Sequence, residues 1–308
     1  MSIKLTILGC HSASPRKNAF PTAQFLEIKE RKFLIDCGEG TQVLLRKHKV
    51  QFSKIKHIFI SHLHGDHFYG LIGLISTFGL HGRKNDLHIY GPKGIKEIIT
   101  LQIKLAKSWT KYKLLFHELE NLESELIFED KKVEVYTIPL SHRIYTNGFL
   151  FKEKLGERKL NMDVIRSNPK IEICDYHNLK KGKDYISEDG NSIILNSKLT
   201  LPPSKPLSYA FCSDTQYLPS IVPIIKNVDI LYHESTFLED KKELTKQTKH
   251  STAKEAASIA QQANVGQLIL GHYSSRYDNL ELFKEEAKTI FTNIYLAESG
   301  KVFEIKQL

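Results

Sequence analysis

Three histidines and an aspartate stand within six positions of the chain, at His62, His64, Asp66 and His67. His62 and His64 are two residues apart, so their rings can point the same way on an extended or turning backbone. Gly65 lets the chain fold back and present Asp66 and His67 to a second position. Neutral imidazole and carboxylate are ligands that Zn²⁺ and its transition-series neighbours accept. The pattern predicts a metal centre, and the alternative is a histidine-rich surface turn without metal.

Several short apolar runs of strand type end close to residues of this kind. The run 58–60 leads into the histidines, 32–36 ends in Asp36, and 131–140 delivers His142. The chemistry of an α/β sheet gathers at the carboxyl ends of its strands. Asp36 could instead be a carboxylate at the N-terminus of the next helix, and His142 taken alone could be an ordinary surface histidine.

Three later apolar runs also end close to histidine or acidic residues. The runs 207–212, 228–232 and 267–271 lead into Asp214, the pair 233–234 and His272, respectively. Amphipathic or apolar segments between the runs predict helices, and these are expected at about 42–48, 68–80, 93–114 and 253–262. The alternation of strands and helices indicates an α/β fold.

The segment 93–114 carries six lysines and a single acid, Glu97. Four isoleucines and Trp109 supply the apolar face of a helix, so the lysines would line its other side. Such a face is either merely solvated or borders a phosphate-binding surface, and the sequence leaves both interpretations open.

Three stretches of the chain resemble motifs of known enzymes. The stretch 62–67 resembles the metal motif of the metallo-β-lactamase superfamily. The stretches 233–236 and 250–252 resemble His-Glu-Ala-Thr and His-Ser-Thr motifs of the ribonuclease Z family, with Ser235 where alanine is usual. Lactamases, thiolesterases and phosphodiesterases share the metal motif, whereas the later pair points to tRNA cleavage. Over most of its length the chain therefore resembles the short form of ribonuclease Z.

This resemblance implies a set of seven metal ligands. They are His62, His64, Asp66, His67, His142, Asp214 and His272. In the superfamily the first two and His142 hold one metal, Asp66, His67 and His272 hold the other, and Asp214 spans both. The resemblance implies two Zn²⁺ ions per subunit, with Mn²⁺ or Fe²⁺ as alternatives for the same nitrogen and oxygen set. Asp36 and His233 would support the ligands by hydrogen bonding.

The resemblance also implies catalytic roles. Asp66 would orient the nucleophile and accept its proton, and His250, oriented by Glu234, would protonate the departing oxygen. Two divalent cations would make hydroxide available and neutralise charge on the phosphodiester. Read without the family, His250 is an exposed residue before a helix N-cap.

Hydroxyls and a guanidinium follow the last ligand at Ser274, Ser275 and Arg276. These groups suit holding a phosphate beside the scissile one. Arg276 could instead form a structural ion pair.

A long irregular stretch, 152–183, holds nine basic and five acidic residues with little periodicity. Inside a compact domain such a stretch is normally functional or disordered. The family carries a protruding arm here that grips the tRNA body, so the resemblance implies an inserted flexible arm at 152–190. The Gly-Pro pair that the arm tip often carries is absent. The residues expected to contact tRNA are Lys152, Lys154, Arg158, Lys159, Lys180, Lys181 and Lys183.

Composition limits the remaining possibilities. With 308 residues and 41% hydrophobic content the chain can bury a sizeable core, and its net charge of +9 favours polyanionic partners. Four widely spaced cysteines suit a reducing cytoplasm and argue against thiolate zinc sites. The start reads as a strand and not as an export signal. The longest apolar stretch, 68–80, is too short to span a bilayer.

We therefore expect a single domain over 1–308 with the superfamily's four-layer αββα sandwich and the protruding arm. The resemblance implies a cytoplasmic, zinc-dependent endoribonuclease that cleaves the 3′ trailer from precursor tRNA after the discriminator nucleotide. It would leave a 3′-hydroxyl on the tRNA and a 5′-phosphate on the trailer. The expected partners are precursor tRNA and a second copy in a homodimer, without membrane or nucleotide cofactor. The alternatives are a small-molecule phosphodiesterase, arylsulfatase or thiolesterase, and an RNA-binding protein with an idle site.

Overall fold

A computed structural model describes residues 2–13, 15–187 and 190–306. The chain divides into two compact units, of which the first comprises residues up to 152 together with 207–306, and the second comprises 153–206. The first unit holds every predicted metal ligand. The second extends further along the chain than the expected end of the insertion at residue 190.

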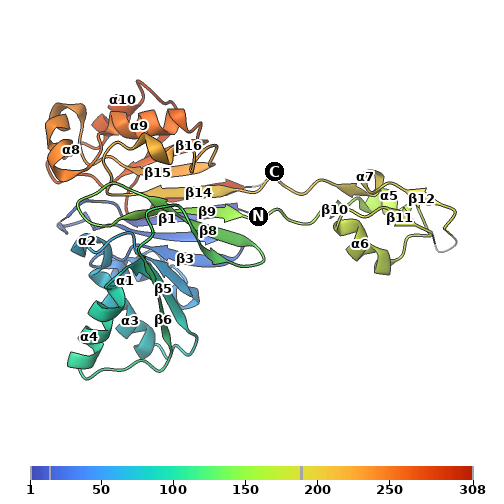
Figure 1. Cartoon of the computed structure of the whole chain (residues 1–308), viewed down its shortest axis with the longest axis horizontal. Coiled ribbons are helices and arrows are strands. Elements are labelled where there is room, and N and C mark those ends of the chain that lie inside the picture. The colour runs from blue at the N-terminus through green and yellow to red at the C-terminus, as the bar shows by residue number, and fades with distance from the viewer. Residues whose placement is uncertain (1, 14, 188–189, 307–308) are drawn as a thin grey trace. The chain divides into compact units, whose positions relative to one another are not determined.

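The first unit contains two seven-stranded sheets (Figure 1). The first sheet has the order β18-β1-β2-β3-β4-β5-β6. Its strands are β1 (Ser2–Gly9), β2 (Ala23–Ile28), β3 (Arg31–Ile35), β4 (His57–Phe59), β5 (Leu87–Pro92), β6 (Leu114–Leu119) and β18 (Val302–Lys306). The pairs β3–β4, β4–β5 and β5–β6 are parallel, so the carboxyl ends of these strands lie at one edge.

The second sheet has the order β17-β16-β15-β14-β9-β8-β7. Its strands are β7 (Leu126–Glu129), β8 (Val133–Pro139), β9 (Asn147–Glu153), β14 (Ser208–Cys212), β15 (Ile230–Glu234), β16 (Gln267–Gly271) and β17 (Ile294–Leu296). The strands β14, β15, β16 and β17 pair in parallel, and β14 pairs antiparallel with β9.

Helices cover the outer face of each sheet (Figure 1). The first sheet carries α1 (Thr41–Lys47), α2 (Gly65–Phe68), α3 (Gly70–Leu80) and α4 (Ile95–Leu105), with the short 3₁₀ turn η1 (Phe52–Lys54). The second sheet carries α8 (Lys242–Thr248), α9 (Ala253–Gln262) and α10 (Glu281–Ala287), with the turns η3 (Pro219–Ile221) and η4 (Glu239–Lys241). The expected four-layer αββα arrangement is therefore confirmed.

Aromatic side chains fill the space between the two sheets. Phe33 and Phe59 of the first sheet face the second sheet, where their ring centroids lie 5.3 Å from Phe151 and Phe149, respectively. Leu34 points the opposite way and packs with the residues of α1 and α3, because successive side chains of a strand alternate between its faces. The two sheets thus share one core while each keeps a second core under its own helices.

The helix expected at 93–114 is shorter than its pattern indicates. Ile95 and Ile99 are buried as expected, but α4 ends at Leu105 and the backbone of Lys107 has a φ of 49°. The prediction that Trp109 completes the apolar face is wrong, since its side chain lies beyond the helix and is 79% exposed. Within the described residues, no helix has the length and apolar character needed to cross a bilayer.

The second unit has a small core of its own. Its elements are β10 (Lys159–Leu160), α5 (Met162–Arg166), η2 (Ile173–Asp175), α6 (Tyr176–Lys180), β11 (Tyr185–Ile186), β12 (Ile193–Ile194), α7 (Asn196–Leu199) and β13 (Thr200–Leu201). The buried residues of the core are Ile165, Ile171, Leu179, Tyr185 and Leu199. These elements are two to five residues long, which is too short to give a readable period in the sequence.

Candidate metal centre

Asp36 follows β3 and holds the loop that follows β4. Its carboxylate accepts hydrogen bonds from Ser61 N at 2.7 Å, from Ser61 Oγ at 2.9 Å and from His67 Nδ1 at 2.7 Å. The contact is possible because β3 and β4 are parallel neighbours whose carboxyl ends lie side by side. Asp36 is fully buried, and this burial raises the pKa of its carboxyl against the opposing effect of His67. It does not cap α1, whose N-cap residue is Gly40.

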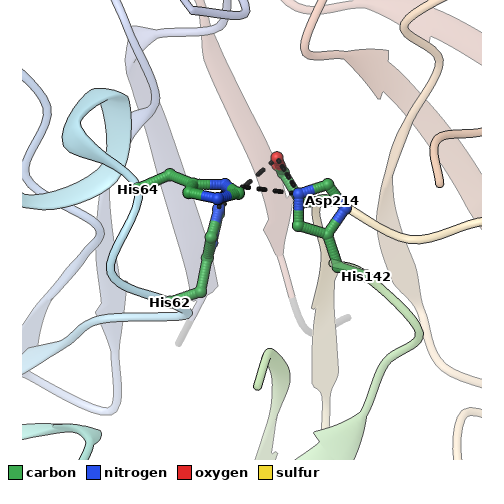
Figure 2. Close-up of side chains that lie close together, drawn as sticks. All are labelled: His62, His64, His142 and Asp214. Carbon is green, nitrogen blue, oxygen red and sulfur yellow. Dashed lines mark hydrogen bonds and ion pairs between the residues drawn. The ribbon is translucent and has the colours of Figure 1, made fainter. Parts of the chain in front are cut away.

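One group of ligands is formed by His62, His64, His142 and Asp214, whose side chains point toward one another in Figure 2. The two histidines of the loop lie with His62 Nε2 at 3.0 Å from His64 Nδ1. His142, which follows β8, places Nε2 at 3.3 Å from His64 Nδ1. One ligand atom of each residue lies within 4.8 Å of all the others. This spacing suits a single metal ion.

A second group is formed by Asp66, His67 and His272. Asp66 Oδ2 lies 3.5 Å from His67 Nε2 and 3.6 Å from His272 Nε2. Asp214 stands between the two groups. Its Oδ1 lies 3.2 Å from both His67 Nε2 and His272 Nε2, whereas its Oδ2 lies 3.5 Å from His62 Nε2. A carboxylate that turns one oxygen to each group is suited to bridge two cations.

Hydrogen bonds fix which ring nitrogen of His272 and His142 is free. Thr236 Oγ1 donates its single proton to Glu234 Oε2 at 2.6 Å, so it must accept from His272 Nδ1 at 2.9 Å. His142 Nδ1 donates to the carbonyl oxygen of Lys249 at 3.0 Å. Both rings therefore carry their proton on Nδ1 and present the lone pair of Nε2 to the cluster.

Hydrogen bonds also place a proton on Nδ1 of His62 and of His67, which directs Nε2 of each ring to the cluster. Ser61 Oγ donates to Asp36, so it accepts from His62 Nδ1 at 3.0 Å, and His67 Nδ1 donates to Asp36 directly. The buried Nε2 atoms of His67 and His272 have no hydrogen-bond partner among the described residues. Buried polar atoms are normally satisfied. A divalent cation would satisfy them, so the residues present fit a metal-binding site.

Burial and mutual charge prepare these groups for cations. Burial lowers the pKa of His62 well below its usual value and brings the pKa of His142 to about 4, so both rings are neutral at pH 7. Burial acts to raise the pKa of Asp66, but the imidazoles of His67 and His272 hold it below its usual range. Burial acts to lower the pKa of His67, but the surrounding carboxylates raise it well above its usual value, so a cation would have to displace a proton from this ring. His62 and His142 offer neutral nitrogen and Asp66 offers anionic oxygen, which belong to the donor set of Zn²⁺.

Glu234 and His250 form a buried pair beside the cluster. His250 Nδ1 donates to Glu234 Oε1 at 2.8 Å. Burial acts to lower the pKa of His250, yet the Glu234 carboxylate raises it to about 9. The His250 ring centroid lies 5.0 Å from that of His142 and 5.3 Å from that of His272. A cationic ring thus stands close to both groups of ligands.

His250 could itself complete a third group with Asp214 and His272, since one ligand atom of each lies within 4.8 Å of the others. Its Nδ1 is engaged by Glu234, which leaves only Nε2 for any other role. Nε2 makes no hydrogen bond to another described residue. The His250 ring is therefore fixed through Nδ1, and its Nε2 is available to contact a substrate.

One predicted supporting residue, His233, does not face the cluster. His233 and Glu234 are consecutive in β15 and so point to opposite faces of the sheet, and His233 Nδ1 donates to the Glu234 carbonyl oxygen at 2.8 Å. Ser274 is buried and accepts from Arg276 Nη1 at 3.3 Å. Ser275 and Arg276 are exposed. The described part of the chain supplies no ion pair to Arg276.

The basic residues predicted to contact tRNA are mostly at the surface. Lys152 lies at the end of β9, with its Nζ 5.3 Å from the centroid of the Tyr136 ring. Within the second unit, Lys159, Lys181 and Lys183 are exposed. Arg158 is partly buried and donates from Nε to Thr200 Oγ1 at 2.7 Å. Lys154 and Lys180 are partly exposed.

Three groups that orient the ligands were missed by the sequence analysis. They are the hydroxyls of Ser61 and Thr236 and the carbonyl oxygen of Lys249. The two hydroxyls carry a signal, because each stands within two residues of a motif residue. A backbone carbonyl carries none, since every residue has one.

Two solved structures resemble this chain over nearly its whole length. The metallo-β-lactamase-fold protein YhfI of Bacillus subtilis covers 99% of this chain and 100% of its own, with 20% identity and a TM-score of 0.69. Human tRNase Z, short form, covers 97% of this chain and 98% of its own, with 25% identity and a TM-score of 0.70. Two facing sheets with a histidine and aspartate cluster at one edge define a protein of the metallo-β-lactamase fold with a metal-binding site.

Sequence relatives narrow this class. The family model described as Anti-Pycsar protein Apyc1 matches residues 3–165. Ribonuclease Z of Bacteroides fragilis is 44% identical over 297 residues, which cover 96% of this chain and 97% of its own. The chain belongs to the ribonuclease Z family and, through residues 3–165, to the family of that model.

Proposed function

We propose that this protein is a metal-dependent endoribonuclease that removes the 3′ trailer from precursor tRNA. It cleaves after the discriminator nucleotide, leaving a 3′-hydroxyl on the tRNA and a 5′-phosphate on the trailer. The observation that carries the proposal is the buried pair of His250 and Glu234 beside the cluster. Other hydrolases of this fold share the metal ligands, whereas this pair resembles a feature of tRNA cleavage. Relatives named ribonuclease Z support the same conclusion.

We propose that the site holds two Zn²⁺ ions, with Mn²⁺ or Fe²⁺ as alternatives. His62, His64 and His142 would hold one, Asp66, His67 and His272 the other, and Asp214 both. The support is the division of the Asp214 oxygens between the two groups. When bound, such cations lower the pKa of water toward neutrality and neutralise negative charge on the phosphodiester.

The protein's own groups position the nucleophile and the leaving group. Asp66 Oδ2 accepts a hydrogen bond from Ala13 N at 2.8 Å, which fixes the carboxylate that orients the attacking water and takes its proton. His250 gives the proton of Nε2 to the departing O3′ of the discriminator nucleotide while Glu234 holds the opposite side of the ring. A positioned acid of this kind contributes roughly 10²- to 10⁴-fold to the rate.

Substrate contacts away from the scissile bond are proposed for two regions. Ser275 and Arg276, with Ser274 behind them, would hold a neighbouring phosphate, and their exposure directly after His272 supports this role. The second unit would bind the body of the tRNA as an arm at 152–190, for which the exposed lysines give support. We further propose that the protein acts as a homodimer in the cytoplasm, as its resemblance to the family implies.

The decisive experiment incubates the purified protein with a 3′-extended tRNA, with and without a chelator, and maps both ends of each product. We expect a single cut after the discriminator nucleotide that the chelator abolishes and added metal restores. A protein that binds this RNA without cutting it would be an RNA-binding protein with an idle site. A protein that hydrolyses only a small phosphodiester would belong to another branch of the fold.

A further inference from the structure

We propose that the outer side of α4 and the loop after it bind the single-stranded 3′ trailer where it leaves the metal centre. The surface consists of Lys96, Lys104, Lys107, Trp109 and Lys111, and is called the lysine face below. The proposal rests on the proposed function, because it assigns a place to one part of that substrate.

The lysines of this face are free to meet phosphates. Lys96, Lys104, Lys107 and Lys111 are exposed, and the described residues offer their side chains no hydrogen bond or ion pair. Neighbouring Lys93 differs, since its Nζ pairs with Glu120 at 2.9 Å. Lys96 and Lys104 lie about 80° apart around the helix axis. Lys104 is on the side opposite the buried isoleucines of α4, and Lys96 is on the flank between.

An exposed aromatic ring stands at the end of the row. Trp109 is the only tryptophan of the chain, and 79% of its surface is exposed. A single exposed hydrophobic side chain is common on protein surfaces, so the ring is informative only because it stands beside exposed lysines. Basic side chains with an exposed aromatic ring are the usual means of binding single strands, because unpaired bases can stack on the ring. A duplex hides its base faces, so the ring favours the unpaired trailer over the tRNA stem.

The lysine face begins beside the metal loop. Leu63, between two predicted ligands, has its Cδ1 at 3.8 Å from the position that a Cβ would take at Gly94, just before α4. Tyr69 directly follows the helix that carries Asp66 and His67, and it is 65% exposed. With Phe68, Ile72, Ile99 and Gln102 it lines a hollow of about 210 Å³ between α3 and α4. A strand leaving the cluster past Tyr69 therefore meets α4 next.

A second copy of the chain is the other occupant that an exposed helix face could have. Between Lys93 and Lys113 there are six lysines and only Glu97 as an acid. Two such faces related by a twofold axis would place like charges opposite each other, which disfavours the contact. The charge of the face is complementary to RNA.

Binding is tested with oligouridylate and the intrinsic fluorescence of Trp109. We expect saturable quenching whose affinity falls as salt rises. The variant K96A/K104A/K107A should bind more weakly, and the slope of log K against log[salt] should fall by about 2, since each single-strand phosphate contact contributes about 0.7. The control variant K226A/K246A/K288A removes three exposed lysines elsewhere and should bind as wild type does.

Removing the ring is measured with labelled RNA, because Trp109→Ala also removes the fluorophore. Loss of one base stack should weaken binding roughly 5- to 150-fold. Wild-type affinity of this variant, or a lysine variant whose salt slope is unchanged, would overturn the proposal.

Cleavage separates this proposal from the proposed function. On precursor tRNA with a long trailer, K96A/K104A/K107A should raise KM roughly tenfold. A single-nucleotide trailer carries no phosphate beyond the scissile one and should be cut with unaltered KM. Equal losses on both substrates would overturn the proposal and leave the nuclease assignment intact. If wild type cuts neither substrate, the proposed function fails while the oligouridylate result stands by itself. Conversion of a dimer to a monomer in the lysine variant, with RNA affinity unchanged, would assign the face to a second copy.

Discussion

The pair of His250 and Glu234 allows the sharpest test of the site. His250→Ala removes the proposed acid and leaves all seven predicted ligands unsubstituted. We expect turnover of precursor tRNA to fall roughly 10²- to 10⁴-fold and metal content to stay unchanged. The measurement is single-turnover cleavage together with metal analysis of the same preparation.

Glu234→Gln should lower both the rate and the stability. Oε1 accepts from Thr215 N and His250 Nδ1, and Oε2 accepts from Thr236 N, Thr236 Oγ1 and Ser251 N. An amide nitrogen at Oε1 opposes one backbone N–H, whereas at Oε2 it would oppose two, so the first orientation is preferred. One buried N–H left without an acceptor costs about 1–3 kcal/mol, which corresponds to a melting temperature lower by roughly 2–6 °C.

The glutamine also changes the acid itself. With an amide donor opposite Nδ1, the neutral ring with its proton on Nε2 is favoured over the cationic ring. In the native protein the carboxylate raises the pKa of His250 to about 9. Its loss lowers that pKa. A general acid must be protonated, so activity is lost as pH rises through its pKa, and in Glu234→Gln this loss should begin at a lower pH.

The two residues should behave as one unit. The double variant E234Q/H250A should therefore cleave no more slowly than H250A alone, because effects within a catalytic unit are not additive. Multiplying losses in the double variant would show that Glu234 acts independently of His250. Full turnover in H250A, or loss of metal equal to the loss of rate, would refute the assignment of His250 as an acid.

Three further tests address the support of the site, the helix behind it and the second unit. Asp36→Asn places an amide against three donors and should weaken metal binding roughly 10- to 100-fold, and retention of metal on dialysis equal to wild type would contradict this. Gly70→Ala brings a Cβ to 2.2 Å from the Gly38 carbonyl oxygen and should lower the melting temperature, whereas Gly79→Ala in the same helix meets nothing within 4 Å and should raise stability by up to about 1 kcal/mol. Deleting 154–206 should raise KM for precursor tRNA and spare hydrolysis of a small phosphodiester, and equal losses on both would make the segment structural.

The local part of the site could be predicted from the sequence because its donors are nearly consecutive. The glycine turn at Gly65 and the short run before it are enough to bring His62, His64, Asp66 and His67 to one place. The strand pattern places His142, Asp214 and His272 at strand ends, but only the resemblance names them as ligands of the same centre. Their convergence depends on which strands pair and which sheets face each other, and packing between distant segments decides that.

Two other differences have local causes. The helical period around Ile95 and Ile99 continues as far as Ile103. The chain then turns at Lys107 with a positive φ, and a lysine in the sequence does not predict such a turn. Trp109 therefore leaves the face on which the period would place it. In the second unit, elements of two to five residues leave no period to detect, although Ile165 and Leu179 are buried in a common core.

The predicted ligands come from both sheets. The loop after β4 supplies four of them, while His142, Asp214 and His272 follow strands of the second sheet. A cation bound by these ligands would link the two sheets. It would stabilise the folded state, since only the folded chain assembles the complete set of ligands. Each tenfold rise of free metal above the dissociation constant then adds about 1.4 kcal/mol to the free energy of unfolding. In a cell short of metal, such a protein would be degraded faster as well as being less active, because a larger unfolded fraction is exposed to proteases.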